Sequence, residues 1–217
     1  MTISATTQGL RPGVCTSSNR PVSPFEGQMI YETDTDLTYI YGGSAWQQVS
    51  GGTAVGNSGL VYITSASATS GSSLAVNNCF SSTYNSYRVI IDNANCSGGV
   101  QMTMTFGATI TSYYWANLTV SYNTGAVAGS NGANTASIQL GAVIDTNAGN
   151  GAAIDILNPN LVARTAILST GTDNRVGELA RWGQAFVANT TQYTGFTIAI
   201  GASTFTSCNV RVYGYRL

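Results

Sequence analysis

Apolar and polar residues alternate strictly from residue 100 to residue 106, in the order Val-Gln-Met-Thr-Met-Thr-Phe. Successive side chains of a β-strand point to opposite faces of its sheet, so this alternation predicts a strand with one buried and one exposed face. Residues 196–200 and 208–212 repeat the pattern. Half-buried strands of this kind are typical of antiparallel sheets, which restricts the fold more than any other feature of the chain.

Seven further segments have strand-like composition, and clusters of glycine, asparagine, serine and threonine separate them. About ten short strands divided by turn residues predict an all-β fold, an antiparallel β-sandwich of the jelly-roll kind. One stretch departs from the period of two, because Phe80, Tyr84 and Tyr87 are spaced by four and three residues, which predicts a helical turn over residues 79–86. The seven strand candidates are residues 60–65, 87–92, 115–122, 137–144, 152–157, 162–168 and 184–188.

The first fifty residues differ from the rest, since they hold three of the four prolines. Residues 1–24 show no periodicity, which predicts an extended arm. Two β-prone runs, residues 28–33 and 38–41, are joined by an Asp/Thr turn and predict a β-hairpin, and two glycines lead to a further strand. We therefore expect an arm and hairpin over residues 1–50, a glycine-rich linker over 51–58 and the sandwich over 59–217.

The chain contains no histidine and no lysine, and its eight positive charges are all arginines. Without histidine there is no imidazole general base or metal ligand, and without lysine there is no Schiff base or P-loop lysine. The net charge of −1 and the scattered arginines argue against nucleic-acid binding, which needs clustered positive charge. These absences favour a non-enzymatic protein with no catalytic residues.

A pair of carboxylates is the catalytic chemistry that remains, because glycoside hydrolysis needs two of them about 5–9 Å apart. The predicted sandwich has five carboxylates, all in turn-like or strand-edge contexts. This placement favours a structural interpretation over a glycosidase. The five are Asp92, Asp145, Asp155, Asp173 and Glu178.

Metal and cofactor sites are not expected. Glu32, Asp34 and Asp36 alternate along the hairpin and would share one face if they stood on one strand, but their spacing lacks the glycine and bidentate glutamate of a calcium loop. A solvated turn is therefore favoured. The cysteines show no CxxC spacing, and free buried thiols are favoured over a Cys79–Cys96 disulfide. The four cysteines are Cys15, Cys79, Cys96 and Cys208.

Only 8% of the residues are charged, so little like-charge repulsion keeps copies of the chain apart. This favours a closed oligomer that covers apolar surface. The first residues lack the basic and apolar regions of a signal peptide, and no stretch approaches the roughly 18 apolar residues of a membrane helix. We expect that the chain does not insert into a membrane and that it is assembled in a cytoplasm.

Aromatic residues cluster at two places in the predicted sandwich. Exposed tyrosine and tryptophan side chains beside a polar neighbour can stack on sugar rings or anchor a partner, whereas buried ones pack in the core. Packing within the sandwich or between subunits is the favoured interpretation, and glycan contact is the alternative. The residues are Tyr113, Tyr114, Trp115, Arg181 and Trp182.

Residues 20–49 resemble a short β element of tailed-bacteriophage virion proteins, carried here by Arg-Pro at 20–21, Pro-Phe-Glu-Gly-Gln-Met-Ile-Tyr-Glu-Thr-Asp-Thr at 24–35, Tyr39, Tyr41, Gly42 and Trp46. Residues 74–92 also look like the opening of β-sandwich domains in phage fibre and head-decoration proteins. The chain has no repeat array or coiled coil between the two regions, which favours a short knob over a long fibre.

The resemblance implies a virion protein that is usually a homotrimer and contacts other virion proteins of the capsid, neck or tail. The implied attachment segment contains Arg20, Pro21, Pro24, Tyr31 and Trp46. The resemblance implies no catalytic residue and no cofactor. A receptor-binding adhesin that recognises a glycan of the host-cell surface is the alternative function.

Overall fold

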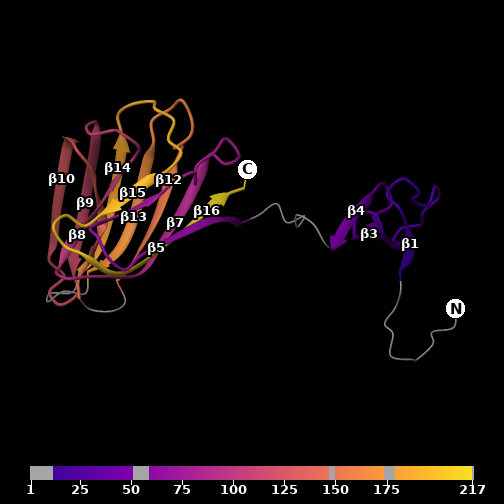
Figure 1. The fold of residues 1–217 in the computed structure, drawn as a ribbon, viewed down its shortest axis with the longest axis horizontal. Helices are drawn as coiled ribbons and strands as arrows, with labels where there is room; N and C mark the ends of the chain where they lie inside the picture. The colour runs from indigo at the N-terminus through magenta and orange to yellow at the C-terminus, as the bar shows by residue number, and fades with distance from the viewer. Residues whose placement is uncertain (1–11, 51–58, 147–149, 174–178, 217) are drawn as a thin grey trace. The chain divides into compact units, whose positions relative to one another are not determined.

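The computed structural model describes residues 12–50, 59–146, 150–173 and 179–216, and contacts divide the chain into two compact units, Met1–Ser58 and Gly59–Leu217 (Figure 1). The described residues contain sixteen strands and no helix. The prediction of an all-β fold is therefore confirmed.

The amino-terminal unit is a four-stranded sheet in the order β1-β2-β3-β4. The antiparallel pairs β2–β3 and β3–β4 form the predicted hairpin and its further strand. Residues 1–11 of the expected arm lie outside the described residues, but residues 13–15 pair in parallel with β2 and are part of the sheet. The expectation of an arm as far as residue 24 is corrected accordingly. The strands are β1 (Gly13–Cys15), β2 (Met29–Glu32), β3 (Leu37–Tyr41) and β4 (Trp46–Ser50).

The second unit is an antiparallel sandwich of unequal layers, one of eight strands and one of four. The large sheet has the order β10-β9-β14-β13-β12-β7-β16-β5. Its strands are β5 (Leu60–Ala68), β7 (Ser86–Cys96), β9 (Tyr113–Ser121), β10 (Val127–Thr135), β12 (Ala152–Leu157), β13 (Ala166–Asp173), β14 (Leu179–Val187) and β16 (Phe205–Tyr215).

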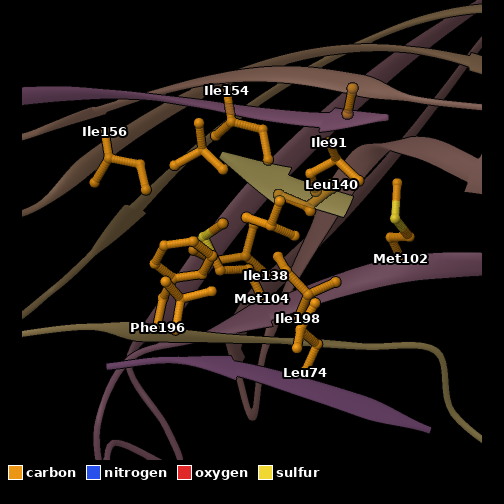
Figure 2. Close-up of a cluster of buried hydrophobic side chains, with 14 of the residues drawn as sticks. Leu74, Ile91, Met102, Met104, Ile138, Leu140, Ile154, Ile156, Phe196 and Ile198 are labelled. Carbon is orange, nitrogen blue, oxygen red and sulfur yellow. The ribbon is translucent and has the colours of Figure 1, made fainter. Parts of the chain in front are cut away.

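The small sheet has the order β11-β8-β15-β6. The chain forms one strand of this sheet at a time and returns to the large sheet after each of the four. Alternating apolar residues from both sheets meet between the layers, as Figure 2 shows for Ile91 and Ile154 opposite Leu74 and Ile198. Such interdigitation of two inner faces is the usual core of a sandwich. The small-sheet strands are β6 (Ser73–Val76), β8 (Val100–Thr105), β11 (Ile138–Ile144) and β15 (Phe196–Ala199).

The two sheets come unusually close where β11 crosses β13 and β14. A Cβ atom added at Gly171 would lie 2.4 Å from the carbonyl oxygen of Gly141, and one at Gly183 would lie 2.9 Å from the amide nitrogen of Gly141. The amide of Gly141 donates to Ser169 Oγ at 2.9 Å, so a side chain of one sheet bonds the backbone of the other. At positions 171 and 183, only glycine fits this crossing without displacing its neighbours.

The predicted helical turn over residues 79–86 is wrong, because bends and a turn lead directly into β7. The three aromatic residues gather without a helix: Tyr87 lies 4.7 Å from Phe80 and 6.0 Å from Tyr84 between ring centroids. The Tyr87 hydroxyl accepts from the amide of Ser81 and donates to its carbonyl. These bonds satisfy backbone groups that a helical turn would otherwise pair.

Candidate functional site

The residues proposed for glycan or partner contact are divided between the two sides of the large sheet. Tyr113 is completely buried, and its hydroxyl accepts from the amide of Phe106 at 2.8 Å and lies 3.1 Å from the carbonyl oxygen of Thr109. Burial raises the pKa of Tyr113. Trp115, two residues along β9, also packs against the core, and its indole N–H donates to Thr135 Oγ1 at 3.1 Å. Both side chains therefore hold the sandwich together.

Arg181 likewise points toward the small sheet, where its guanidinium donates to Gln101 Oε1 at 3.5 Å. The amide nitrogen of Gln101 in turn donates to the carbonyl oxygens of Leu140 and Ala142, where the pairing of β8 with β11 is irregular. Arg181 thus supports a side chain that satisfies backbone groups at this irregularity.

Removing the Tyr113 hydroxyl is expected to lower the free energy of unfolding by about 1–2 kcal/mol, because the buried amide of Phe106 loses its acceptor. Tyr114→Phe is the matched control: Tyr114 stacks on Phe186 with ring centroids 5.0 Å apart, and the substitution keeps that ring, so we expect a change within about 0.5 kcal/mol. Urea unfolding of both variants measures the difference. Equal losses would contradict a specific role for the Tyr113 hydroxyl.

Tyr114 and Trp182 lie on the opposite side of the large sheet, which we call the outer face. The strand register places Leu118, Trp182, Thr170, Ala153 and Ile90 in one row across β9, β14, β13, β12 and β7. A neighbouring row contains Gln184, Leu168, Asp155, Arg88, Tyr213 and Tyr62.

Most of the exposed large apolar side chains in the described part of the sandwich lie on the outer face. Two others, Ile110 and Val162, lie in loops and are 76% and 75% exposed. Trp182, near the centre of the face, is 46% exposed. The apolar side chains of the outer face are Leu60, Tyr62, Leu118, Tyr122, Val127, Leu168 and Trp182.

Two pairs of opposite charges lie on the outer face. Arg88 Nη1 lies 3.4 Å from Asp155 Oδ2, and the Tyr215 hydroxyl donates to Asp155 Oδ1 at 2.7 Å. Burial and the bond to Asp155 raise the pKa of Tyr215. Arg211 forms a second ion pair with Asp92. Two further arginines lie at this face: the Arg164 guanidinium is 5.6 Å from the ring centroid of Phe186, and Arg216 lines the same hollow as Asp155 and Leu168.

Shallow cavities hollow the outer face. One of about 450 Å³ is lined by Tyr122, Ala153, Ala180 and Trp182 among others, and one of about 390 Å³ by Leu157, Leu168 and Tyr215 among others. A cavity of about 580 Å³ lies elsewhere, between the loops that contain Thr109 and Tyr193.

The carboxylates considered for hydrolysis do not converge where they are described. Asp155 lies opposite Arg88 on β7, and Asp92 lies four residues further along the same strand, which is about 13 Å. Asp145 is buried, and its carboxylate accepts from Asn150 Nδ2 at 2.9 Å. The side chain of Asp173 and the whole of Glu178 lie outside the described residues. These arrangements give each described carboxylate a structural partner.

No metal site is found in the described residues: no group of three or more Cys, Asp and Glu is placed to hold an ion there. Glu32 is buried at the end of β2, whereas Asp34 and Asp36 belong to the exposed turn that follows. Asp34 accepts from the amide and hydroxyl of Ser17, which lowers its pKa. The contribution of Asp34 to stability is therefore present at neutral pH and lost as the pH falls through its lowered pKa.

All four cysteines are free, and they differ in burial. Burial raises the pKa of Cys79 to about 12 and that of Cys208 to about 11; it also raises the pKa of Cys15, whose side chain is only partly buried and stays accessible to a reagent. We expect a thiol reagent at pH 8 to modify Cys15 alone in the folded protein and all four cysteines in urea, because the thiolate is the reactive form. Mass spectrometry of the modified peptides measures this. Early modification of Cys79 or Cys208 would contradict the burial.

The residues of the implied attachment segment shape the amino-terminal unit. Arg20 forms an ion pair with the fully buried Glu32, and its guanidinium lies 4.3 Å from the ring centroid of Tyr39. The bond to Glu32 raises the pKa of Arg20. The Tyr31 hydroxyl donates to Asp36 Oδ1 at 2.7 Å.

The remaining residues of that segment are only partly buried. Pro21 and Pro24 lie in the connection between β1 and β2, and Trp46 packs edge-on against Tyr41 with ring centroids 5.4 Å apart. All of these contacts lie within the amino-terminal unit.

One side of the amino-terminal sheet is only partly covered by the described residues of its own unit. Register pairs Val14 with Tyr31, and Met29 with Ile40, so these four side chains share the face opposite Ile30 and Glu32. Val14 is 45% and Met29 is 48% exposed. We call these four residues the open face of the amino-terminal unit.

The sequence pattern alone identifies neither the outer face of the large sheet nor the open face of the amino-terminal unit. The signal on β9 is present, because Tyr114, Ala116, Leu118 and Val120 alternate with inward residues. However, both sets contain apolar residues, so the pattern does not say which set is buried. The pairing of β9 with β14 shows that the set with Tyr114 and Leu118 faces the same side as Trp182.

Comparison with protein-family models, with curated proteins and with solved structures gives no match for this chain. The described residues include no helix long and apolar enough to cross a membrane.

Proposed function

We propose that this chain is a non-enzymatic structural protein of a tailed-phage virion. In this proposal it forms a short, exposed, trimeric fibre, spike or decoration, and residues 1–50 dock it on the particle. The observation that carries the proposal is the open face of the amino-terminal unit, an apolar sheet surface with Val14 and Met29 nearly half exposed. The resemblance of residues 20–49 to virion proteins points to the same unit.

The small core of the amino-terminal unit supports a docking role. Of residues 12–49, only Ile30 and Glu32 are buried, and one of these is charged. A unit of about 40 residues rarely gains enough stability from its own core and usually relies on disulfides, a metal or association. Its cysteine, Cys15, is free. Association through the open face is the route that this unit retains.

The non-enzymatic part of the proposal rests on chemistry. The sequence lacks histidine and lysine, and each described carboxylate of the sandwich has a partner that holds it in place. A general acid or base needs a suitable partner and a reacting atom within reach. The arrangement of Asp92, Asp145 and Asp155 fits structural roles instead.

Incorporation of the full-length chain into particles tests the proposal. Met29→Glu places a charge on the open face, and we expect at least a tenfold loss of the protein from purified particles. Ile110→Glu changes a more exposed apolar residue in a sandwich loop and is expected to leave incorporation unchanged. Equal incorporation of the Met29 variant and the wild type would reject docking through this unit.

A receptor-binding adhesin is the second candidate, favoured by Trp182, which is 46% exposed beside the 450 Å³ cavity that Tyr122 also lines. Aromatic rings beside a hollow are a common way to stack on sugars. Purified full-length protein would then compete with phage adsorption to host cells, and Trp182→Ala would abolish the competition. Absence of competition by the wild type would reject the adhesin.

A further inference from the structure

We infer that the outer face of the large sheet is the contact surface between copies of this chain. The partner is a second copy of this chain, and the surface is the outer face. Only the number of copies, three, rests on the proposed function. The amino-terminal unit contributes nothing to the argument.

The exposed apolar area of the outer face is sufficient for a stable contact. Its seven large apolar side chains are between 41% and 65% exposed. Aromatic side chains of this kind bury roughly 150–250 Å² each and the aliphatic ones less, so the seven together leave on the order of 700 Å² accessible, spread from β5 to β10. Standard interfaces bury about 800 Å² on each partner, and a typical monomer exposes a largest patch of about 300–600 Å². Summed over the face, the exposed apolar area is close to the size of a standard interface.

The charges of the outer face permit it to be covered. Covering an unpaired charge carries a heavy desolvation penalty, whereas a charge that already has its partner loses less. Arg88 and Asp155 are paired, with Tyr215 as a third member, and Arg211 is paired with Asp92. The part of the face around Leu118 and Trp182 therefore needs no complementary charge from a partner, and a second copy of the same face meets this condition.

The chemistry of the hollows also favours a copy of the chain over a glycan. The lining of the 450 Å³ cavity is mostly apolar, with Ile90, Ala153, Ala180 and Trp182, and its polar members are Thr170, Tyr122 and Arg181. A sugar needs several converging hydrogen-bond groups, whereas apolar side chains need only a hollow of suitable size. Another copy supplies such side chains at Leu118, Tyr62 and Trp182, and tyrosine and tryptophan are types that anchor interfaces.

Sedimentation equilibrium of the full-length protein tests the inference. We expect a mass of three chains, or another closed number, at micromolar concentration. The double variant Leu118→Glu with Trp182→Glu places charges on register partners of β9 and β14 and is expected to raise the dissociation constant at least 100-fold. Ile110→Glu and Val162→Glu, in exposed loops, are the matched controls and are expected to keep the wild-type mass.

A measurement on the wild type guards against variants that fail to fold. Hydroxyl-radical footprinting across a dilution series is expected to show Tyr62, Leu118 and Trp182 protected at high concentration and oxidised on dilution, whereas Ile110 and Val162 remain oxidised throughout. A monomer at every concentration would overturn the inference, and so would an oligomer whose outer face stays oxidised. A protected oligomer that is absent from particles would reject the proposed function and leave the inference standing.

Discussion

Gly171→Ala is expected to destabilise the sandwich by about 3 kcal/mol, a large effect for the addition of one methyl group. The new Cβ would lie 2.4 Å from the carbonyl oxygen of Gly141 and 2.6 Å from the Cβ of Ala142, both on β11. Neither atom belongs to a flexible side-chain end, so the two sheets must move apart. In open surroundings, the same substitution usually stabilises a protein slightly by restricting the unfolded chain.

Gly129→Ala is the matched control for Gly171→Ala. Gly129 lies on β10 of the same sheet, and its nearest neighbour would be 3.8 Å from an added Cβ. We expect a change within about 0.5 kcal/mol. Urea unfolding at one fixed protein concentration, followed by circular dichroism, compares both variants with the wild type. Similar midpoints for the two variants would contradict the close crossing of the sheets.

Arg20→Ala is expected to unfold the amino-terminal unit while the sandwich stays folded. The substitution leaves Glu32, which is completely buried, without its cation, and it removes the guanidinium from the ring of Tyr39. Loss of one partner of a buried ion pair typically costs about 3–5 kcal/mol, which exceeds what so small a core can supply. Thr35, which donates to Glu32 at 2.9 Å, cannot compensate the charge.

Hydrogen exchange measured by mass spectrometry reports on the two units separately. Peptides that cover β2 and β3 are expected to lose protection in the Arg20→Ala variant, while peptides that cover β7 and β16 keep theirs. Arg20→Lys retains the charge without the planar group and is expected to lose part of the protection. Glu26→Gln alters an exposed carboxylate of the same unit and serves as the control. Full protection of β2 in the alanine variant would disprove the role of the ion pair.

The strands that sequence reasoning found are those whose pattern is local. Residues 100–106 alternate cleanly, and the structure places Val100–Thr105 in β8 with Met102 and Met104 completely buried. β10 is not predicted from the sequence, because its residues, Val-Ala-Gly-Ser-Asn-Gly-Ala-Asn-Thr, are rich in turn-forming types. Pairing with β9 makes it a strand, and that contact is not visible in its own composition.

The positions of the candidate site residues also depend on contacts between strands that the sequence of one segment does not show. Alternation requires Tyr113 and Tyr114 to face opposite sides, but only the register shows that Tyr113 enters the core and that Trp115 follows it. The spacing of Phe80, Tyr84 and Tyr87 correctly predicted that their rings lie together. Hydrogen bonds of the Tyr87 hydroxyl hold this segment in place, and no helix is formed. The outer face depends on the register of eight strands, which no single segment encodes.

An electron cryomicroscopy map of particles purified from the source of this gene tests the central proposal most directly. The account predicts this protein on the particle surface in closed groups of three, with the amino-terminal units against the particle and the outer faces of the large sheets turned toward one another. Particles that lack the protein, or copies whose outer faces lie open to solvent with no neighbour against Leu118 and Trp182, would contradict it.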